Sequence, residues 1–177
     1  LATWNVNSLK VRLEQVLDWM DANTIDILAL QETKLTDDQF PVSVFVEKGF
    51  HVTFSGQKTY NGVAIVSRYP LSEITTDISH FDDPQRRILM ASVAGLRLLN
   101  LYVPNGAAVD SDKYQYKLNW LAAIHRYIEE QLVLYPKLVV VGDFNIAPED
   151  RDVHDPKAWE GQVLCSPAER AALQEII

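Results

Sequence analysis

Short apolar runs that end abruptly in polar residues recur along this chain and constrain its fold more than any other feature. The segments LATWNVN, DILALQETK, LLNLYVPNG and LVVVGDFN begin at residues 1, 26, 98 and 138. Apolar runs of this length, bounded by turn residues, are typical of buried strands. One strand that ends in an amide or an acid indicates only a turn. Four such endings predict polar groups gathered along one rim of a sheet sandwich.

The pattern also predicts where the strands and helices lie. Strands are expected at residues 1–6, 25–31, 50–55, 62–67 and 138–141, with two more within 88–103, and helices at 11–23, at 114–135 and from residue 167 onward. The first two helices carry apolar stripes at helical spacing, formed by Leu13, Val16, Leu17 and Met20 and by Tyr114, Leu118, Leu121, Ile128 and Leu132. The third helix opens with a capping box of Ser166 and Glu169 around Pro167. Strands dominate, and helices lie between only some of them, so we expect a mixed-sheet α/β sandwich in one domain, residues 1–177.

The charge balance and the single cysteine limit the class of protein. A net charge of −8 over 177 residues argues against a passive nucleic-acid-binding module, which usually carries a basic face. An acidic chain can still act on phosphates if a bound divalent cation reverses the local field. Cys165 is the only cysteine, which suits a reducing compartment. With no apolar run of membrane-spanning length and no visible signal segment, the prediction is a cytoplasmic monomer without a membrane partner.

The residue types at the strand ends favour one kind of chemistry. The predicted rim carries Asn5, Asn7, Gln31, Glu32, Lys34, Asn100, Tyr102, Asn105, Asp143 and Asn145. Oxygen ligands without a thiolate cluster suit Mg²⁺, with Mn²⁺ as the alternative, and Mg²⁺ takes only one or two protein carboxylates. Amides and a tyrosine hydroxyl can donate hydrogen bonds to phosphate, while an aspartate can accept a proton from water. Together these groups predict metal-assisted phosphodiester hydrolysis.

The segment LVVVGDFNIAP leaves two interpretations open. Successive side chains of an extended strand point to opposite faces, so Asp143 and Asn145 are expected on the same side of the chain. The alternative is a turn, because Gly142, Asp143 and Asn145 are common turn residues and Pro148 follows. By itself this segment favours the turn.

Five motifs, taken in order along the chain, favour the site interpretation of Asp143 over the turn. WNVNSLK, LQETK, NGVAIVSR, LYVPNG and GDFNIAP resemble the exonuclease III family of abasic-site endonucleases, within the endonuclease/exonuclease/phosphatase superfamily. The resemblance covers essentially the whole chain. It implies a DNase I-like four-layer sandwich of two mixed β-sheets flanked by helices, and it makes the turn the weaker interpretation of Asp143.

The resemblance also implies a role for each matching residue. Glu32 would be the metal carboxylate, Asn5 would help to form the metal and phosphate pocket, and Asp143 and Asn145 would complete the metal site. Tyr102 would hold the scissile phosphate, Asp143 would orient or deprotonate the attacking water, and Asn145 would stabilise the transition state. The expected substrate contacts are Asn7, Lys10, Lys34, Tyr60, Asn105, Arg86 and Arg87.

The chain departs from the family in two places. The first motif has Ser8 and Lys10 where the family commonly has glycine and arginine, and lysine lacks the bidentate fork of arginine. The family's closing segment, with a second aspartate and a catalytic histidine in a Ser-Asp-His motif, has no counterpart. None of His51, His80, His125 and His154 lies in such a motif. An incomplete C-terminal part of the domain is the first explanation.

The function that the resemblance implies is a Mg²⁺-dependent DNA phosphodiesterase of base-excision repair. It would cut duplex DNA 5′ to abasic sites and remove nucleotides or blocking groups from 3′ ends. Two alternatives remain. One is a superfamily phosphatase or phosphodiesterase acting on lipid or small-molecule phosphates, and the other is a truncated chain that binds a partner without catalysis.

Overall fold

The computed structural model describes residues 1–177, which divide into two units. The first unit comprises residues 1–77, 82–102 and 135–143, and the second comprises residues 78–81, 103–134 and 144–177. No helix is both long and apolar enough to span a membrane.

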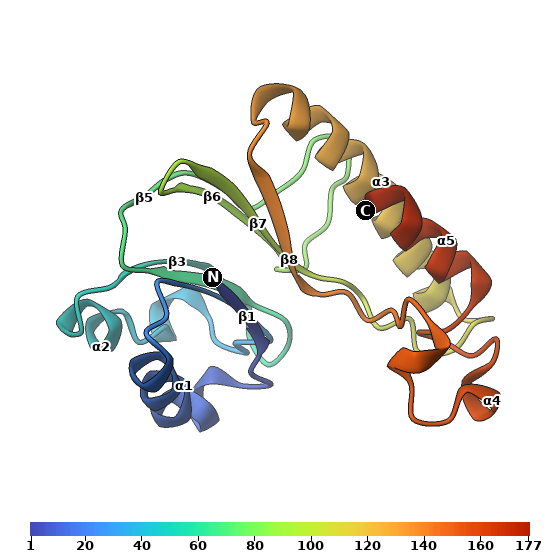
Figure 1. Cartoon of the computed structure of the whole chain (residues 1–177), viewed down its shortest axis with the longest axis horizontal. Coiled ribbons are helices and arrows are strands. Elements are labelled where there is room, and N and C mark those ends of the chain that lie inside the picture. The colour runs from blue at the N-terminus through green and yellow to red at the C-terminus, as the bar shows by residue number, and fades with distance from the viewer. The chain divides into compact units, whose positions relative to one another are not determined.

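The first unit contains two four-stranded mixed sheets (Figure 1). One sheet has the order β1 (Ala2–Asn5), β2 (Ile27–Gln31), β4 (Val63–Ser67), β3 (His51–Ser55). The other has the order β5 (Leu71–Thr75), β6 (Ile88–Val93), β7 (Leu96–Tyr102), β8 (Leu138–Asp143). Each sheet has one parallel pair, β1 with β2 and β7 with β8, and its other pairs are antiparallel. The predicted mixed-sheet α/β class is confirmed.

The two sheets enclose an apolar layer, and a hydrogen-bonded pair of amide side chains lies buried between them. The layer is formed by Ile27, Val63, Ile65, Leu89, Ala91, Val93 and Leu98. Gln31 and Asn100 are both buried, and Gln31 Nε2 donates to Asn100 Oδ1 at 2.7 Å. Asn100 Nδ2 then donates to the backbone carbonyls of Leu30 and Ala64, at 2.9 and 3.0 Å. Buried amides need such partners, so this pair ties β7 to the first sheet instead of facing the predicted rim.

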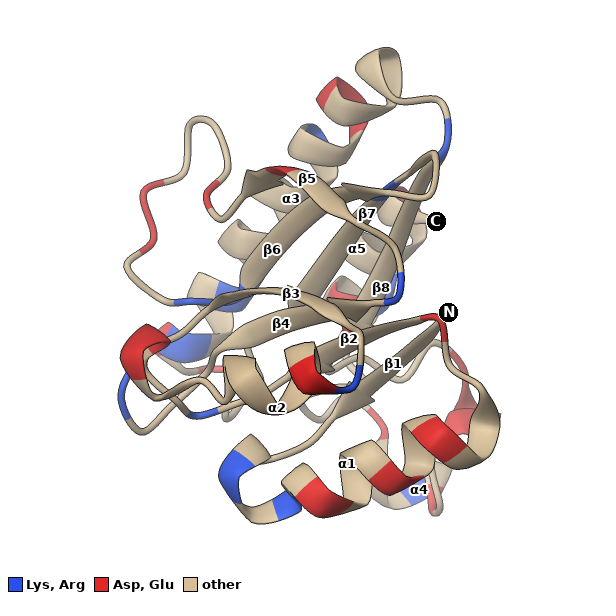
Figure 2. Cartoon of the chain, turned by 90° about the vertical axis from the view of Figure 1, so that its left-hand side faces the viewer, with Lys and Arg blue, Asp and Glu red and all other residues tan.

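Helices cover the outer face of the first sheet, away from the second (Figure 1). They are α1 (Leu9–Asn23) and α2 (Val42–Glu47), with a 3₁₀ turn, η1 (Asp37–Gln39), before α2. Val16 and Met20 of α1 are fully buried in this layer, as the apolar stripe predicted. The exposed face of α1 carries Glu14, Asp18 and Asp21 (Figure 2). Beyond Lys10 of the first turn, this face is therefore acidic and unsuited to a phosphate backbone.

The second unit is helical. Its elements are α3 (Asp112–Leu134), η2 (Asp150–Asp152), α4 (Pro156–Trp159) and α5 (Pro167–Ile176), and α5 packs along α3 (Figure 1). The predicted capping box is confirmed, because Ser166 accepts from the Glu169 backbone and Glu169 accepts from the Ser166 backbone. Trp120 is fully buried on α3.

The structure also corrects parts of the sequence prediction. Neither α2, α4 nor the edge strand β5 was predicted, because each is short and β5 has three exposed residues in its middle. Leu132 was assigned to the apolar stripe of α3 but is 47% exposed, whereas Lys117 is fully buried there. The interpretation of residues 1–177 as one domain stays a prediction.

Candidate active site

The carboxyl ends of the two parallel strand pairs carry the site in the first unit. Asn5 ends β1, Glu32 follows the last residue of β2, and Tyr102 and Asp143 are register partners at the ends of β7 and β8. Asn5 Nδ2 donates to Glu32 Oε1 at 2.8 Å and to Asp143 Oδ2 at 2.7 Å. One amide group thus bridges two carboxylates from different sheets. We call Asn5, Glu32, Tyr102 and Asp143 the carboxylate site.

The backbone of Glu32 is held in a conformation that a glutamate rarely adopts. Its φ is 53°, in the left-handed region, where a residue other than glycine stores about 1–3 kcal/mol of strain. Neighbouring backbone groups fix this turn: Ser8 N donates to the Glu32 carbonyl at 2.7 Å, and Thr33 N donates to the Gly62 carbonyl at 3.1 Å. A Cβ on Gly62 would lie 2.2 Å from Thr33 Oγ1, so only glycine allows this approach. Strain of this kind is common at functional sites.

Glu32 is poised to be ionised. Burial raises the pKa of Glu32, but hydrogen bonds from Asn5, Lys34 and Tyr102, together with the Lys34 charge, outweigh burial and lower the pKa below its ordinary value. Lys34 Nζ lies 3.0 Å from Glu32 Oε2 and also donates to Asn7 Oδ1. The predicted residues Asn7 and Lys34 are therefore both brought to Glu32.

Tyr102 keeps its hydroxyl proton. Burial raises its pKa first, and the hydrogen bond to Glu32 and the charges of Glu32 and Asp143 add to this, with partial opposition from Arg87. The Arg87 guanidinium lies 4.5 Å from the centre of the Tyr102 ring, and its Nη1 donates to the Tyr102 carbonyl at 3.1 Å. Tyr102 is thus a neutral hydrogen-bond donor, and Arg87 supports its ring.

Gly142 brings β8 close to β7 beside Asp143. Its φ is +145°, and an added Cβ would lie 1.9 Å from the Leu101 carbonyl oxygen. Since β8 runs through Asp143, which pairs in register with Tyr102, the interpretation of Asp143 as a turn residue is wrong. The strand ends there, however, and Asn145 has a φ of 49°, so the expectation that both residues project from one extended strand is also wrong.

The second unit holds the other two predicted amides. Asn105 Nδ2 donates to Asn145 Oδ1 at 3.3 Å, and Asn145 Nδ2 donates to the Val103 carbonyl at 2.9 Å. Asn105 Oδ1 accepts from the Ala107 backbone at 3.2 Å. These two asparagines are brought together as predicted.

The remaining predicted residues lie on the surface of the first unit. Lys10 is exposed in the first turn of α1, and Tyr60 is 67% exposed between β3 and β4. Arg86 Nη1 lies 3.4 Å from Asp77, an exposed pair of little energetic weight. The alternative role of Asn5 and Asn7 as helix caps is not observed, because Ser8 occupies the N-cap of α1 and no side chain caps that helix.

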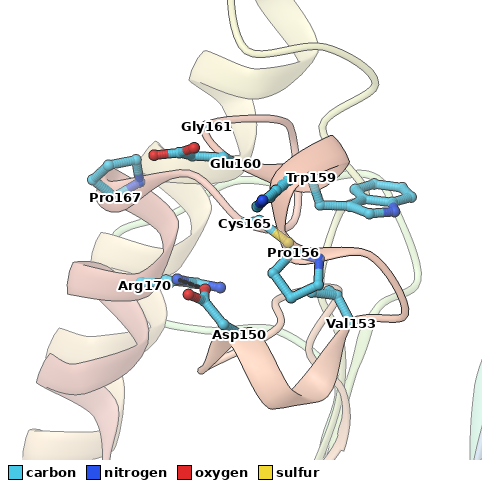
Figure 3. A pocket seen from close by; sticks show the side chains of 10 residues that line it. Asp150, Val153, Pro156, Trp159, Glu160, Gly161, Cys165, Pro167 and Arg170 are labelled. Atoms are coloured by element: carbon cyan, nitrogen blue, oxygen red, sulfur yellow. Dashed lines mark hydrogen bonds and ion pairs between the residues drawn. The ribbon is translucent and has the colours of Figure 1, made fainter.

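A cavity of about 410 Å³ opens in the second unit, and none of the predicted site residues lines it (Figure 3). It is lined by Asp150, Val153, Pro156, Lys157, Trp159, Glu160, Gly161, Cys165, Pro167 and Arg170. Arg170 Nη1 lies 2.9 Å from Asp150 Oδ1 at its wall, and this hydrogen bond raises the pKa of Arg170. The cavity brings together an ion pair and an aromatic ring but no set of groups suited to phosphate chemistry.

The donor set of the carboxylate site fits a hard divalent cation. Nowhere in the chain do three His, Cys, Asp or Glu side chains gather as a metal cage. Mg²⁺ does not require one, because it takes one or two carboxylates and keeps several waters. Glu32, ionised and oriented by Asn5, is the carboxylate that could hold the ion.

The fold and the site together define a phosphoester-cleaving enzyme, with polar strand ends converging from two mixed sheets. A family model described as the Endonuclease/Exonuclease/phosphatase family matches residues 2–163. The chain belongs to this family, so the resemblance drawn from the five motifs is confirmed.

Relatives and solved structures support the same conclusion. The Exodeoxyribonuclease III of Haemophilus influenzae is 30% identical over 186 residues, which cover 98% of this chain and 70% of the relative. A 3′ phosphatase from Neisseria, solved with a product DNA hairpin, is 47% identical with a TM-score of 0.97, and an AP endonuclease from Archaeoglobus fulgidus is 39% identical with a TM-score of 0.93. Both alignments cover 98% of this chain and 68% of the solved chain. The predicted enzyme class, a hydrolase of DNA phosphodiester bonds, is that of these relatives.

The sequence prediction missed Lys117 and the roles of Gln31 and Asn100. Lys117 has a sequence signal, because it lies between Tyr114 and Leu121 on the buried face of α3. A lysine within an apolar helical stripe indicates a paired buried charge. For Gln31 and Asn100 the sequence offers no such signal, since both look like other polar strand ends.

Proposed function

We propose that this chain belongs to a Mg²⁺-dependent DNA phosphodiesterase of base-excision repair. It acts on duplex DNA, cutting 5′ to abasic sites and removing nucleotides or blocking groups from 3′ ends. The observation that carries the proposal is the bridging of Glu32 and Asp143 by the single amide of Asn5, with the Tyr102 hydroxyl bonded to Glu32. Cys165 is free and buried, which suits a monomeric enzyme of the reducing cytoplasm.

A divalent cation fits Glu32 and Asn5, with Asp143 and Asn145 as the further predicted contributors. When bound, it would supply positive charge to the phosphate and lower the cost of charge developing on the leaving oxygen. Mg²⁺ is the cation that suits this oxygen-only donor set, and Mn²⁺ is its closest substitute.

The chain's own residues divide the remaining work. Asp143 accepts the proton of the attacking water at its carboxylate, which the Asn5 amide orients. Tyr102 donates its hydroxyl hydrogen to a phosphate oxygen and remains protonated through the reaction because its pKa is raised. Asn145 and Asn105 present side-chain amides that can donate to the phosphate as its charge grows.

Charged residues around the carboxylate site are suited to hold the DNA backbone. Lys34 is 29% exposed at its side chain and lies against Glu32, where its free face can meet a phosphate. Asn7, Lys10, Tyr60 and Arg86 are the outer contacts in this proposal, while Arg87 acts mainly through Tyr102.

Activity at 3′ ends has separate support. The two Neisseria structures, at 47% identity, carry the names 3′ phosphatase and 3′-5′ exonuclease, whereas the AP endonuclease structure is 39% identical. We therefore propose that removal of 3′ blocking groups is at least as fast as abasic-site incision.

The test is a comparison of two duplexes, one with an internal abasic site and one with a 3′-phosphate at a nick, incubated with full-length protein and Mg²⁺. We expect both to be processed, the second at least as fast as the first, and EDTA to stop both. Failure to process either duplex would contradict the proposal. Turnover of a phosphoinositide in place of DNA would instead support the small-molecule alternative, and tight DNA binding without turnover would support the non-catalytic one.

A further inference from the structure

Lys117 is the one lysine that the structure buries completely, and the proposed chemistry makes no use of it. It lies on α3 in the second unit, on the face that also buries Tyr114, Trp120 and Leu121. Burying an ammonium group is costly unless it is paired and fully hydrogen-bonded. The partners of Lys117 therefore indicate what the chain gains from it.

Three oxygens surround the Lys117 ammonium. Its Nζ lies 2.5 Å from Glu169 Oε1, donates to the Asn145 carbonyl at 2.6 Å and donates to the Asn105 carbonyl at 3.2 Å. An ammonium has three N–H donors, so a lysine with these neighbours can be fully hydrogen-bonded despite its burial. The two carbonyls belong to the same two residues whose side-chain amides are proposed to meet the phosphate.

Glu169 gives this lysine a rigid anchor. Glu169 Oε1 accepts from Leu164 N at 3.0 Å, and Oε2 accepts from Ser166 N at 3.2 Å. The Ser166 hydroxyl lies 2.7 Å from Glu169 Oε2 and 2.5 Å from the Tyr114 hydroxyl. The charge pair thus joins α3 to the capping box of α5, and both side chains are fully buried. We call Lys117, Glu169 and the carbonyls of Asn105 and Asn145 the lysine cluster.

The segments that carry the two asparagines have no regular structure of their own. Gly106 and Ala107 have φ values of 97° and 60°, and Asn145 has a φ of 49°. Such left-handed residues persist only where surrounding contacts over-determine them. Gly106 lies against both Val163 and the Lys117 stem, since an added Cβ would lie 3.1 Å from Val163 Cγ2 and 3.2 Å from Lys117 Cδ.

We propose that Lys117 is a positioning residue for the phosphate-binding amides. Its ammonium, neutralised by Glu169, fixes the carbonyls of Asn105 and Asn145 and so preorganises their side-chain amides. The proposal rests on the proposed function, because the amides are taken to bind the reacting phosphate. Preorganised donors stabilise a transition state without reorganising during the reaction, and a displacement of about 1 Å can cost about 10²-fold in rate.

The first experiment is a mutant cycle in full-length protein. Lys117→Met/Glu169→Gln removes the ammonium without leaving a buried charge unpaired, so the fold should survive, as a melting curve would establish. We expect its kcat on the 3′-phosphate duplex to fall by about 10²-fold with KM little changed. In an Asn105→Ala/Asn145→Ala background the same pair of substitutions should change kcat by less than about twofold. Equal losses in both backgrounds would overturn the proposal, because a general loss of packing acts whether or not the amides are present.

The second experiment does not depend on activity. The side-chain amide resonances of Asn105 and Asn145 in a ¹H–¹⁵N spectrum should shift or broaden in Lys117→Met/Glu169→Gln, while those of Asn23, at the end of α1, stay in place. Unchanged Asn105 and Asn145 resonances would contradict the positioning role. Should the double variant fail to fold, Gly106→Ala carries the same test, because it displaces the Asn105 segment from the Lys117 stem and leaves the charge pair intact.

The two measurements separate this inference from the proposed function. If wild-type protein processes no DNA, but the Asn105 and Asn145 amide resonances differ between wild type and the double variant, the proposed function is contradicted and the positioning role of Lys117 is supported. Wild-type protein that processes DNA, but whose Asn105 and Asn145 amide resonances do not change in the double variant, would support the proposed function and contradict the positioning role.

Discussion

The carboxylate site and the lysine cluster both contain a lysine paired with a glutamate, yet the two pairs differ in burial. Lys34 and Glu32 lie 3.0 Å apart with side chains 29% and 18% exposed, whereas Lys117 and Glu169 lie 2.5 Å apart and are both fully buried. Exposed charges exchange partners at little cost, but buried charges are fixed by the hydrogen bonds that pay for their desolvation. The first pair can give up its contact to a metal or a phosphate, and the second holds backbone in place.

The difference in burial also distinguishes polar groups that are proposed to meet substrate from polar groups that hold the backbone. Groups that meet substrate must be able to change partners during the reaction, and the residues proposed for this role, Asn5, Glu32 and Tyr102, bond to one another around partly exposed carboxylates. Groups that hold the scaffold must not change partners, so Lys117 donates to backbone carbonyls that cannot titrate. Substitutions in the two regions should therefore affect different quantities.

The largest effect should come from breaking the buried pair. Lys117→Met leaves Glu169 buried without its cation, and the free energy of unfolding should fall by about 3–5 kcal/mol. Lys34→Met in the partly exposed pair should cost less than about 1 kcal/mol. Urea denaturation of both variants beside wild type gives the comparison, and equal losses would mean that burial does not distinguish the two pairs.

The next largest effect should be on the rate of cleavage, with little change in stability. Asp143→Asn keeps the shape of the side chain but removes the proposed proton acceptor, so kcat should fall by about 10²-fold or more with the melting temperature little changed. Single-turnover cleavage measures the rate. Asp18→Asn, on the exposed face of α1, is the matched control and should keep wild-type kinetics. A normal rate in Asp143→Asn would leave Asp143 with a structural role only.

Tyr102→Phe should have a smaller effect on rate, since it removes one hydrogen bond to a charged group, worth about 1.5–3 kcal/mol. Because the pKa of Tyr102 is raised, the wild-type rate should not decline as pH rises through the ordinary tyrosine value of about 10. An alkaline absorbance titration of the tyrosines provides the check. Wild type and Tyr102→Phe should give the same amplitude near pH 10, and a larger amplitude in wild type would show that Tyr102 ionises normally.

The smallest effect is the pH dependence of Glu32. Its folded pKa lies below its ordinary value, so its charged form stabilises the fold above the unfolded-state pKa, and this contribution disappears as pH falls through the lowered folded pKa. In metal-free buffer, the stability difference between wild type and Glu32→Gln should be constant near neutral pH and shrink in acid, below the ordinary value of 4.5. A stability difference that grows as pH falls would show that the pKa of Glu32 is raised in the folded protein instead of lowered.

Much of the fold follows from local patterns in the sequence. All strands except β5, together with α1, were predicted because alternation and apolar runs are local signals, and α5 was predicted because its capping box lies within four residues. The pairing of Gln31 with Asn100 and of Lys117 with Glu169 could not be predicted, because each joins residues more than fifty positions apart. The carboxylate site was predicted from the strand ends and the family motifs, but the bridging by Asn5 and the left-handed turn at Glu32 required coordinates.

The contact between Asn5 and Asp143 joins residues 138 positions apart, and this separation bears on when the enzyme becomes competent during its synthesis. Closing so long a loop has an entropic cost that must be met by the packing of the intervening strands. The first sheet can form from residues 1–67, yet without β8 it has no Asp143 beside Asn5. In a nascent chain the contact between Asn5 and Asp143 can therefore form only after β8 has been synthesised, whereas Asn5 and Glu32 become available to each other much earlier.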